Sequence, residues 1–282
     1  MALQKTSGGI ADFAVSPPAE TRSVTLPLRH IARWGVSAFR KSIALVLLAA
    51  LWEIAPRAGL VDPLFLPPLS KVLQAVWTGF ASGQLGVHVL ASLLRAIPGL
   101  ALAIVFGVPL GLLLGVSPRL HQVFDPVLEL FRNTSALALL PVFTLLLGIG
   151  ESSKIIMVFY AAVWPILLGT ITGLRGVDPL WIKAGRSMGL NRFDLFRKIV
   201  LPGAIPSVFT GVRLAAAAAL LVLVAAEMVG SRAGLGYLIN ASELDFDIPG
   251  MYAAILVLSV IGSLTNSVLV SVEKRLLRWK AP

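Results

Sequence analysis

The sequence predicts an all-helical integral membrane protein with six membrane-spanning helices. Hydrophobic residues make up 57% of the 282 residues and charged residues only 13%, whereas a soluble domain carries about 25% charged residues. The mean hydropathy is +0.87, and the apolar runs approach the ~20 residues that a helix needs to cross a bilayer. These observations favour a membrane domain over a soluble fold.

Composition and motifs exclude several classes of function. The chain has no cysteine, which excludes a disulfide framework and thiolate or iron-sulfur chemistry. It has no phosphate-binding GxxxxGK[ST] motif, and its three histidines, His30, His88 and His121, are too widely separated to indicate a metal site. We expect no catalytic site, no metal and no cofactor in this chain. Its net charge of +10 reflects basic residues that flank apolar spans, so we expect no nucleic-acid partner.

The predicted spans divide the chain into three parts. Residues 1–41 are predicted to form a cytoplasmic N-terminal tail, disordered to about Pro27, and a basic interfacial helix at His30–Lys41. The transmembrane domain covers 42–272, and 273–282 form a cytoplasmic C-terminal tail. The six spans are predicted at about 42–56, 87–116, 136–149, 155–174, 208–229 and 251–272. The first and third are short for a span, and Pro98 and Pro109 interrupt the second.

Three connections between the spans also carry expectations. An amphipathic helix is predicted to begin within Leu66–Val72, with Ser70 as its cap. The charged linker 117–135 is predicted to lie outside the membrane with a short helix of its own. Residues 148–154 are predicted to form a tight turn.

The distribution of basic residues orients the protein. The face that carries both termini and the loop after the fourth span holds 19 of the 24 Lys and Arg residues. Because cytoplasmic loops carry the excess of Lys and Arg, both termini and this loop are predicted to be cytoplasmic.

That loop contains two short helices with clear start and stop signals. Asp178-Pro179 predicts a helix start, and Gly189 a helix stop, because glycine enters the left-handed conformation without a steric penalty. Asn191, followed by Asp194, predicts a second helix that ends at Pro202. Phe193, Phe196, Ile199 and Val200 would lie near one face of that helix. The pattern is typical of a docking surface, with Gly189 as its hinge.

The spacing of this stretch resembles the EAA loop of permease subunits of bacterial ABC importers, which docks on the ATPase subunit. The matching residues are Ala184, Gly189, Ile199, Leu201 and Pro202; Lys183 stands where the signature has Glu, and Gly185 where it has its second Ala. The resemblance implies a type I ABC importer permease in the bacterial inner membrane, with residues 175–206 as the coupling loop. It also implies a homodimer, two cytoplasmic ABC ATPases that bind ATP and Mg, and a periplasmic or lipid-anchored solute-binding protein.

Other motifs narrow the resemblance to one branch. LPPLSKV, SLLRAIPG, GIGESSKI, LRGVDP, AAEMVGSRAGLGYLI and EKRLLRW resemble permeases for nitrate, sulfonates and taurine. Asn266 and Asn133-Thr134-Ser135 depart from the pattern of the branch, so importers of a pyrimidine precursor or bicarbonate stay as alternatives. An ion-gradient-driven secondary transporter and a membrane scaffold are alternatives from other classes.

Four residues are candidates for the substrate pathway. Arg95 would attract an anionic substrate or extend its side chain to the membrane surface. Glu227 would pair with an arginine, gate the pathway or simply be hydrated. Ala215 and Ala219 belong to a run of five alanines that would line the pathway or pack helices closely. The segment 231–250 is acidic overall and would meet a binding protein or remain solvated.

Overall fold

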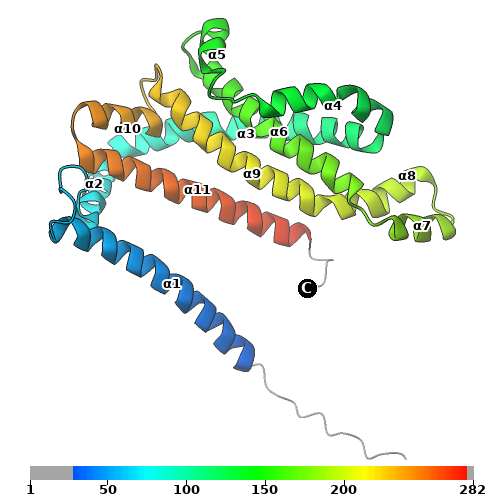
Figure 1. The fold of residues 1–282 in the computed structure, drawn as a ribbon, viewed down its shortest axis with the longest axis horizontal. Coiled ribbons are helices and arrows are strands. Elements are labelled where there is room, and N and C mark those ends of the chain that lie inside the picture. Colours follow the sequence, from blue (N-terminus) through cyan, green and yellow to red (C-terminus); the bar gives the residue numbers. More distant parts are fainter. Residues whose placement is uncertain (1–27, 278–282) are drawn as a thin grey trace, which may run out of the picture. The chain divides into compact units, whose positions relative to one another are not determined.

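The computed structural model describes the backbone of residues 28–277 and the side chains of residues 43–277. Within this range all regular elements are helical. The predicted N-terminal tail, 1–27, and residues 278–282 of the C-terminal tail lie outside the described residues. The helices are α1 (Leu28–Arg57), α2 (Leu69–Ala81), α3 (Gln84–Val116), α4 (Pro118–Asn133), α5 (Leu140–Leu147), α6 (Glu151–Arg175), α7 (Pro179–Ser187), α8 (Arg192–Leu195), the π-helical turn η1 (Phe196–Val200), α9 (Leu201–Met228), α10 (Leu235–Leu244) and α11 (Ile248–Leu276) (Figure 1).

Helix α1 is shared between the two compact units of the chain, residues 1–51 and 52–282. It runs for 30 residues, although the sequence predicted a surface helix at His30–Lys41 and a separate span from Ser42. No proline or glycine lies between Val36 and Ala55, so nothing in the sequence ends the helix there. The predicted boundary is therefore not a break in the helix.

Helix α2 starts within the predicted range Leu66–Val72, but two residues earlier than a cap at Ser70 implies. It begins at Leu69 after Pro68, and Ser70 lies inside its first turn instead of capping it. The Glu53 carboxylate accepts hydrogen bonds from the Ser70 backbone N–H at 2.9 Å and from its hydroxyl at 3.0 Å. A carboxylate from the end of α1 thus supplies the acceptor that Ser70 was expected to provide.

Four helical stretches among the described residues are long and apolar enough to cross a membrane: α3, α6, Arg192–Met228 and α11. They correspond to the predicted spans 87–116, 155–174, 208–229 and 251–272. Helix α6 starts at Glu151, so only residues 148–150 of the predicted turn at 148–154 lie outside a helix. The count of six spans stays a prediction.

The third predicted span, 136–149, is not a single helix. Only α5, with 8 residues, is helical there, and 8 residues extend about 12 Å, far less than the ~30 Å of a bilayer core. Helix α4 also packs along α6, because its Leu128 contacts Leu167 and Ile171 of α6. Nearer the other end of α6, Leu140 and Phe143 pack against a cluster that contains Met157. The chain therefore passes along α6 as two helices broken at 134–139.

Small residues on α3 let it approach α6 closely. Gly99, Ala103, Gly107 and Gly111 recur at every fourth position and are buried. A Cβ at Gly111 would lie 2.6 Å from Cβ of Thr170, and one at Gly107 would lie 3.1 Å from Cγ2 of Ile166. Such spacing allows close helix packing in a membrane, where the hydrophobic effect drives helix association little. Helix α6 also packs against α9, so it forms the centre of the molecule with α3 and α9.

Pro202 does not end the helix that precedes it, contrary to the sequence prediction. The chain continues helical from Arg192 to Met228, with Pro202 in the first turn of α9. Proline lacks an N–H and clashes with the carbonyl four residues earlier in a regular helix. The wider π-helical turn η1, directly before Leu201, accommodates this defect.

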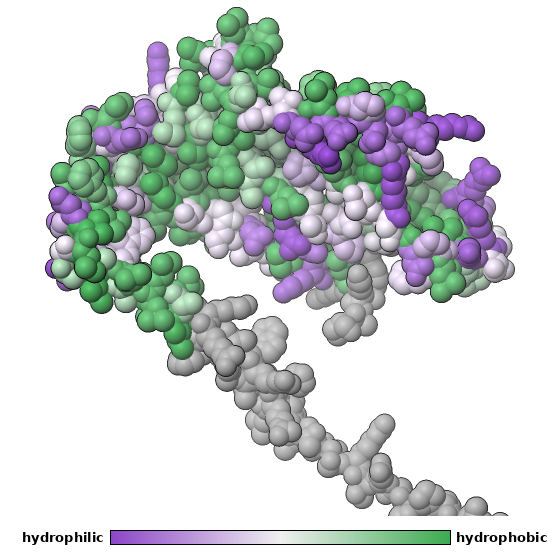
Figure 2. Space-filling view, in the orientation of Figure 1, coloured by the Kyte–Doolittle hydropathy of each residue, from purple (hydrophilic) through white to green (hydrophobic). Residues whose placement is uncertain are grey.

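The two ends of the spans differ in character. Helices α7 and α8 lie at the end where α6 stops and α9 begins, whereas α10 lies at the opposite end (Figure 1). Hydrophilic residues gather over α4, α7 and α8 (Figure 2). Basic residues dominate the cytoplasmic ends of spans, so this hydrophilic end is the one that the sequence predicts to be cytoplasmic.

Candidate functional site

The predicted coupling loop begins with a well-capped helix, α7. The Asp178 carboxylate accepts a hydrogen bond from the Leu180 N–H at 2.8 Å, and Pro179 occupies the first position. At the other end, Gly189 has φ +80, and the N–H of Leu190 donates to the carbonyl of Gly185 at 3.1 Å. This is the hydrogen-bond pattern of a Schellman motif. The predicted start and stop of α7 are confirmed.

The second helix of the loop, α8, packs against α7 at Gly185. Its own start is capped by Asn191, whose side chain accepts from the Asp194 N–H at 2.7 Å. Gly185 is buried, and a Cβ there would lie 2.6 Å from Cδ1 of Ile199 and 3.3 Å from Cδ1 of Leu195. Ile199 thus fills the space that an alanine would occupy at the position where Gly185 departs from the EAA signature.

The outer surface of the loop combines basic and apolar side chains. Lys183 and Ala184 are exposed, and Leu201 and Pro202 are half-buried. Met188 is 77% exposed and Phe193 is 69% exposed. Phe193 was predicted to share a face with Ile199, but the π-helical turn η1 interrupts the 3.6-residue period between them. Apolar side chains beside Arg186 and Arg192 suit a protein partner, because exposed apolar groups of this kind mark interaction sites.

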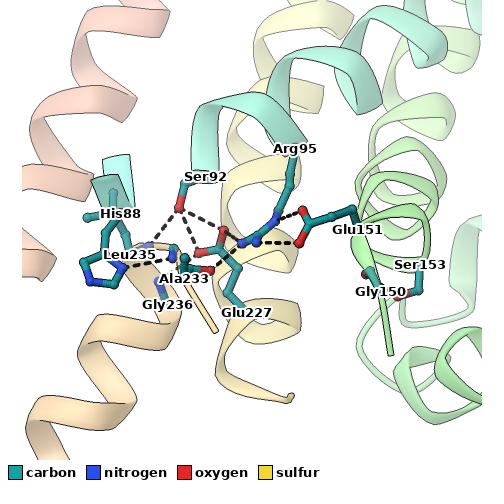
Figure 3. A network of polar contacts seen from close by, with 11 residues as sticks. His88, Ser92, Arg95, Gly150, Glu151, Ser153, Glu227, Ala233, Leu235 and Gly236 are labelled. Atoms are coloured by element: carbon teal, nitrogen blue, oxygen red, sulfur yellow. Dashed lines mark hydrogen bonds and ion pairs between the residues drawn. The ribbon is translucent and has the colours of Figure 1, made fainter. Parts of the chain in front are cut away.

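A buried ion network occupies the opposite end of the spans, with Arg95 at its centre (Figure 3). The guanidinium of Arg95 donates to both carboxylate oxygens of Glu151, at 2.5 and 2.8 Å. Through Nη1 it also donates to Glu227 at 2.7 Å and to the carbonyl of Ala233 at 2.7 Å. The Arg95 side chain is 5% exposed and that of Glu227 is 0% exposed. Arg95 therefore pairs with the fully buried Glu227 carboxylate on one side and with Glu151, whose side chain is 65% exposed, on the other.

Opposite charges meet within this network. Lys154, which is 5% exposed, lies on the same helix as Glu151. Lys154 forms no ion pair among the described residues, so the paired charges are those of Arg95 with Glu227 and with the more exposed Glu151. Compensation of this kind is what allows ionised groups to be buried, because an unpaired charge in an apolar environment is very unfavourable.

The network also holds the start of α10. The Glu227 carboxylate accepts from the Gly236 N–H at 2.9 Å and from the Ser92 hydroxyl at 2.9 Å. The Ser92 hydroxyl in turn accepts from the Leu235 N–H at 2.8 Å, and Nδ1 of His88 accepts from the Gly234 N–H at 3.1 Å. These N–H groups belong to the first turn of a helix, where no intrahelical acceptor is available. Three side chains from α3 and α9 therefore anchor α10.

Gly234 is required by the geometry of this anchor. Its φ of +127 is rarely adopted by residues with a side chain, and a Cβ there would overlap the Glu227 carboxylate. Gly234 thus allows the backbone to approach Glu227. The Gly234-Leu-Gly236 sequence, which lacks the context of a nucleotide fingerprint, has this structural role.

The two alanine candidates lie in the core of the subunit. Ala215 is 0% exposed and Ala219 is 2% exposed, and both belong to a cluster with Ala103 and Val158. Neither is open to a pathway within the described residues of one chain. Their position supports the close-packing interpretation, and a role in the pathway stays a prediction for them and for Arg95 and Glu227.

Sequence reasoning missed most partners of Arg95 and Glu227. Glu151 was assigned to a turn, although it begins α6, and His88 was considered only as a metal ligand. Ser92 lies in SLLRAIPG, and Gly234 and Gly236 lie in AAEMVGSRAGLGYLI, two segments that already carried the family resemblance. Both segments could be recognised as unusual from the sequence. The sequence did not show that they contact each other in the folded protein.

The comparisons with known proteins agree with this architecture. The taurine transport system permease protein TauC of Escherichia coli is 34% identical, over 83% of this chain and 86% of the relative. The putative aliphatic sulfonates transport permease protein SsuC of Bacillus subtilis is 32% identical, over 82% and 84% respectively. Among solved structures, a chain of the inward-facing MetNI methionine ABC transporter matches with a TM-score of 0.56 at 20% identity, covering 66% of this chain and 93% of that one.

The family comparison covers most of the transmembrane domain. Residues 107–278 match the family described as the binding-protein-dependent transport system inner membrane component. This range includes the predicted coupling loop and Glu227. The chain therefore belongs to this inner-membrane family, as an ABC importer permease of the branch that includes the sulfonate and taurine permeases.

Proposed function

We propose that this permease carries a small anionic solute into the cell as the membrane subunit of an ATP-driven importer. An aliphatic sulfonate or taurine is the first candidate substrate, because TauC and SsuC are relatives of this chain over more than four fifths of its length. Nitrate is the second. A pyrimidine precursor and bicarbonate are alternatives on the same scaffold.

The coupling loop would transmit the action of a separate ATPase to the spans. The observation that carries this proposal is the continuous helical path from α8 through η1 into α9, Arg192–Met228. A displacement of α8 is therefore passed directly along α9. At the far end of α9, Glu227 binds Arg95 and the start of α10, so both ends of the molecule are linked through one helix.

The assembly would contain more than this chain. Since the chain has no nucleotide-binding motif, ATP and Mg would be bound by two copies of a cytoplasmic ABC ATPase, each docked on one coupling loop. A second copy of the permease would complete the pathway. A periplasmic or lipid-anchored binding protein would deliver the solute to the end that carries α10.

Growth on single nutrient sources tests the substrate. A deletion strain would receive taurine or an alkanesulfonate as sole sulfur source and, separately, nitrate as sole nitrogen source. We expect loss of growth on the sulfonates alone, with recovery when the gene is restored. Failure on nitrate alone would move the substrate to nitrate, and normal growth on both would contradict both assignments.

Reconstitution tests the coupling. The permease would be placed in proteoliposomes with and without the ATPase encoded with it, and uptake of labelled solute would be measured. We expect uptake only with the ATPase, ATP and the binding protein. Uptake driven by an ion gradient without the ATPase would support a secondary transporter, and stable association without any uptake would support a scaffold.

A further inference from the structure

A polar pocket of about 560 Å³ opens between α2, α3, α10 and α11. Two of the helices that line it, α2 and α10, lie at the end opposite to α7 and α8 (Figure 1). Ser242 and His88 line it and are only 6% and 8% exposed. Among the described residues, neither the Ser242 hydroxyl nor Nε2 of His88 has a hydrogen-bond partner. Both atoms are accessible from the pocket, and the Ser242 hydroxyl can accept a hydrogen bond from a group that enters it.

The charge of the pocket is negative. Its only charged lining residues are Asp245 and Asp247, and neither forms an ion pair within the described part of the chain. His88 adds no positive charge, because Nδ1 accepts a hydrogen bond from Gly234 and the single hydrogen of the neutral ring is then on Nε2. The pocket therefore suits a cation.

The side chains that line the pocket favour an organic cation over a metal ion. The described residues contain no group of three His, Asp or Glu side chains that could hold a metal. Tyr237 lines the pocket and stacks on His88, with ring centroids 5.7 Å apart. A guanidinium or ammonium group binds well where carboxylates and hydroxyls accept hydrogen bonds beside an aromatic ring.

Phe246, between the two aspartates, indicates that the cation belongs to a protein. It is 79% exposed and has φ +56. The N–H of Asp247 donates to the carbonyl of Ser242 at 2.9 Å, so α10 ends in the same Schellman motif as α7. Glycine occupies the left-handed position in α7, whereas α10 places a phenylalanine there. The cap thus presents an apolar ring to solvent, and aromatic anchors of this kind are enriched in protein interfaces.

We propose that this pocket receives a Lys or Arg side chain of the solute-binding protein, while Phe246 packs against the same protein. The inference rests on the proposed function, in which a binding protein delivers the solute at this end. Asp245 and Asp247 would bind the basic group, and Ser242 would accept a hydrogen bond from it. The pocket would thereby set the position of the binding protein over the pathway.

The test removes the charge of the pocket and leaves its shape. Asp245→Asn and Asp247→Asn would be combined, because Asn at 247 keeps the cap that now accepts from the Gly250 N–H at 3.1 Å. Glu243→Gln is the matched control, since Glu243 is an exposed acid of the same helix end that does not line the pocket. Affinity for the binding protein would be measured by biolayer interferometry on the permease–ATPase complex in nanodiscs. We expect binding at least about tenfold weaker for the double variant and unchanged for the control.

Phe246→Gly separates the role of the ring from its role in the fold. Glycine suits the left-handed position better than phenylalanine, so the melting temperature should stay equal or rise while the affinity for the binding protein falls. If this variant and the double asparagine variant both bind like the wild type, the inference is wrong.

Two further measurements exclude other occupants. Methylguanidinium would be titrated into the wild-type complex without the binding protein, and tight binding would assign the pocket to a free small cation. Light scattering would report the assembly state of the double variant, and loss of the permease dimer would assign the pocket to the second copy. Either result would overturn the inference. Absence of ATP-driven uptake by the wild type would instead overturn the proposed function.

Discussion

At the scale of single residues, the pairing of Arg95 with Glu227 determines what a substitution does. We expect Arg95→Met to destabilise the protein by about 3–5 kcal/mol, because it leaves the fully buried Glu227 carboxylate without its cation. Adding Glu227→Gln should recover part of this loss, since the amide removes the unpaired charge. Thermal unfolding of the purified variants in detergent checks both expectations.

The same variants decide whether Arg95 also binds substrate. If its role is to hold Glu227 and Glu151, the double variant should transport more slowly, in proportion to the folded protein, with an unchanged KM for uptake. A KM that rises strongly at a normal level of folded protein would contradict this and restore Arg95 as a substrate ligand.

Gly234 offers a second prediction at this scale. Gly234→Ala should destabilise the protein more than Gly59→Ala, its matched control, because both glycines have positive φ but only Gly234 faces the Glu227 carboxylate. At Gly59 nothing lies within 4 Å of an added Cβ, so the penalty is limited to the backbone, about 1 kcal/mol. Melting temperatures in detergent measure the difference, and equal losses would show that the contact with Glu227 is unimportant.

At the scale of elements, the contact between α7 and η1 determines whether the coupling loop is one rigid body. We expect Gly185→Leu to separate the two helices, because its side chain meets Ile199, Leu195 and Leu190 and overpacking costs about 1–3 kcal/mol. Gly185→Ala is the control, since the only contact below 3 Å is with the flexible end of Ile199. Stimulation of the partner ATPase by the reconstituted permease is the measurement.

The expected outcome distinguishes docking from folding. Gly185→Leu should lose most of the ATPase stimulation while it still inserts into the membrane, and Gly185→Ala should keep it. Full stimulation by Gly185→Leu would mean that the contact between the helices does not matter for coupling.

The caps of α7 show how much of an element the sequence predicts. Asp178, Gly189 and Asn191 act on residues within a few positions of themselves, so local reasoning found the helix ends correctly. Pro202 was misjudged because the π-helical turn before it depends on how α8 packs. The third span was misjudged because a short apolar run looks the same whether it is one helix or part of a two-helix passage.

The buried network shows what local reasoning cannot find. Arg95 and Glu227 are separated by 132 residues, and each was identified as unusual because an ionisable group in a span is unfavourable without a partner. Their pairing depends on how α3 and α9 pack against α6. The sequence thus identified Arg95 and Glu227 as candidate functional residues. It did not predict that they form an ion pair with each other.

At the scale of the whole molecule, the orientation in the membrane can be tested with single cysteines, because the chain has none of its own. Ser187→Cys in α7 and Glu243→Cys in α10 are both exposed and lie at opposite ends of the spans. A membrane-impermeant maleimide should label the α10 variant in spheroplasts and the α7 variant only in inside-out vesicles. The reverse pattern would contradict the orientation derived from the basic residues.

The same labelling tests the number of crossings. The passages through α3, α4 with α5, α6, α9 and α11 alternate in direction, so α1 would bring the total to an even number and place both termini on the side of α7. Ser7→Cys in the N-terminal tail and Ala281→Cys in the C-terminal tail should then both be labelled only in inside-out vesicles. Labelling of Ser7→Cys in spheroplasts would show an odd number of crossings, since an odd number places the termini on opposite faces of the membrane.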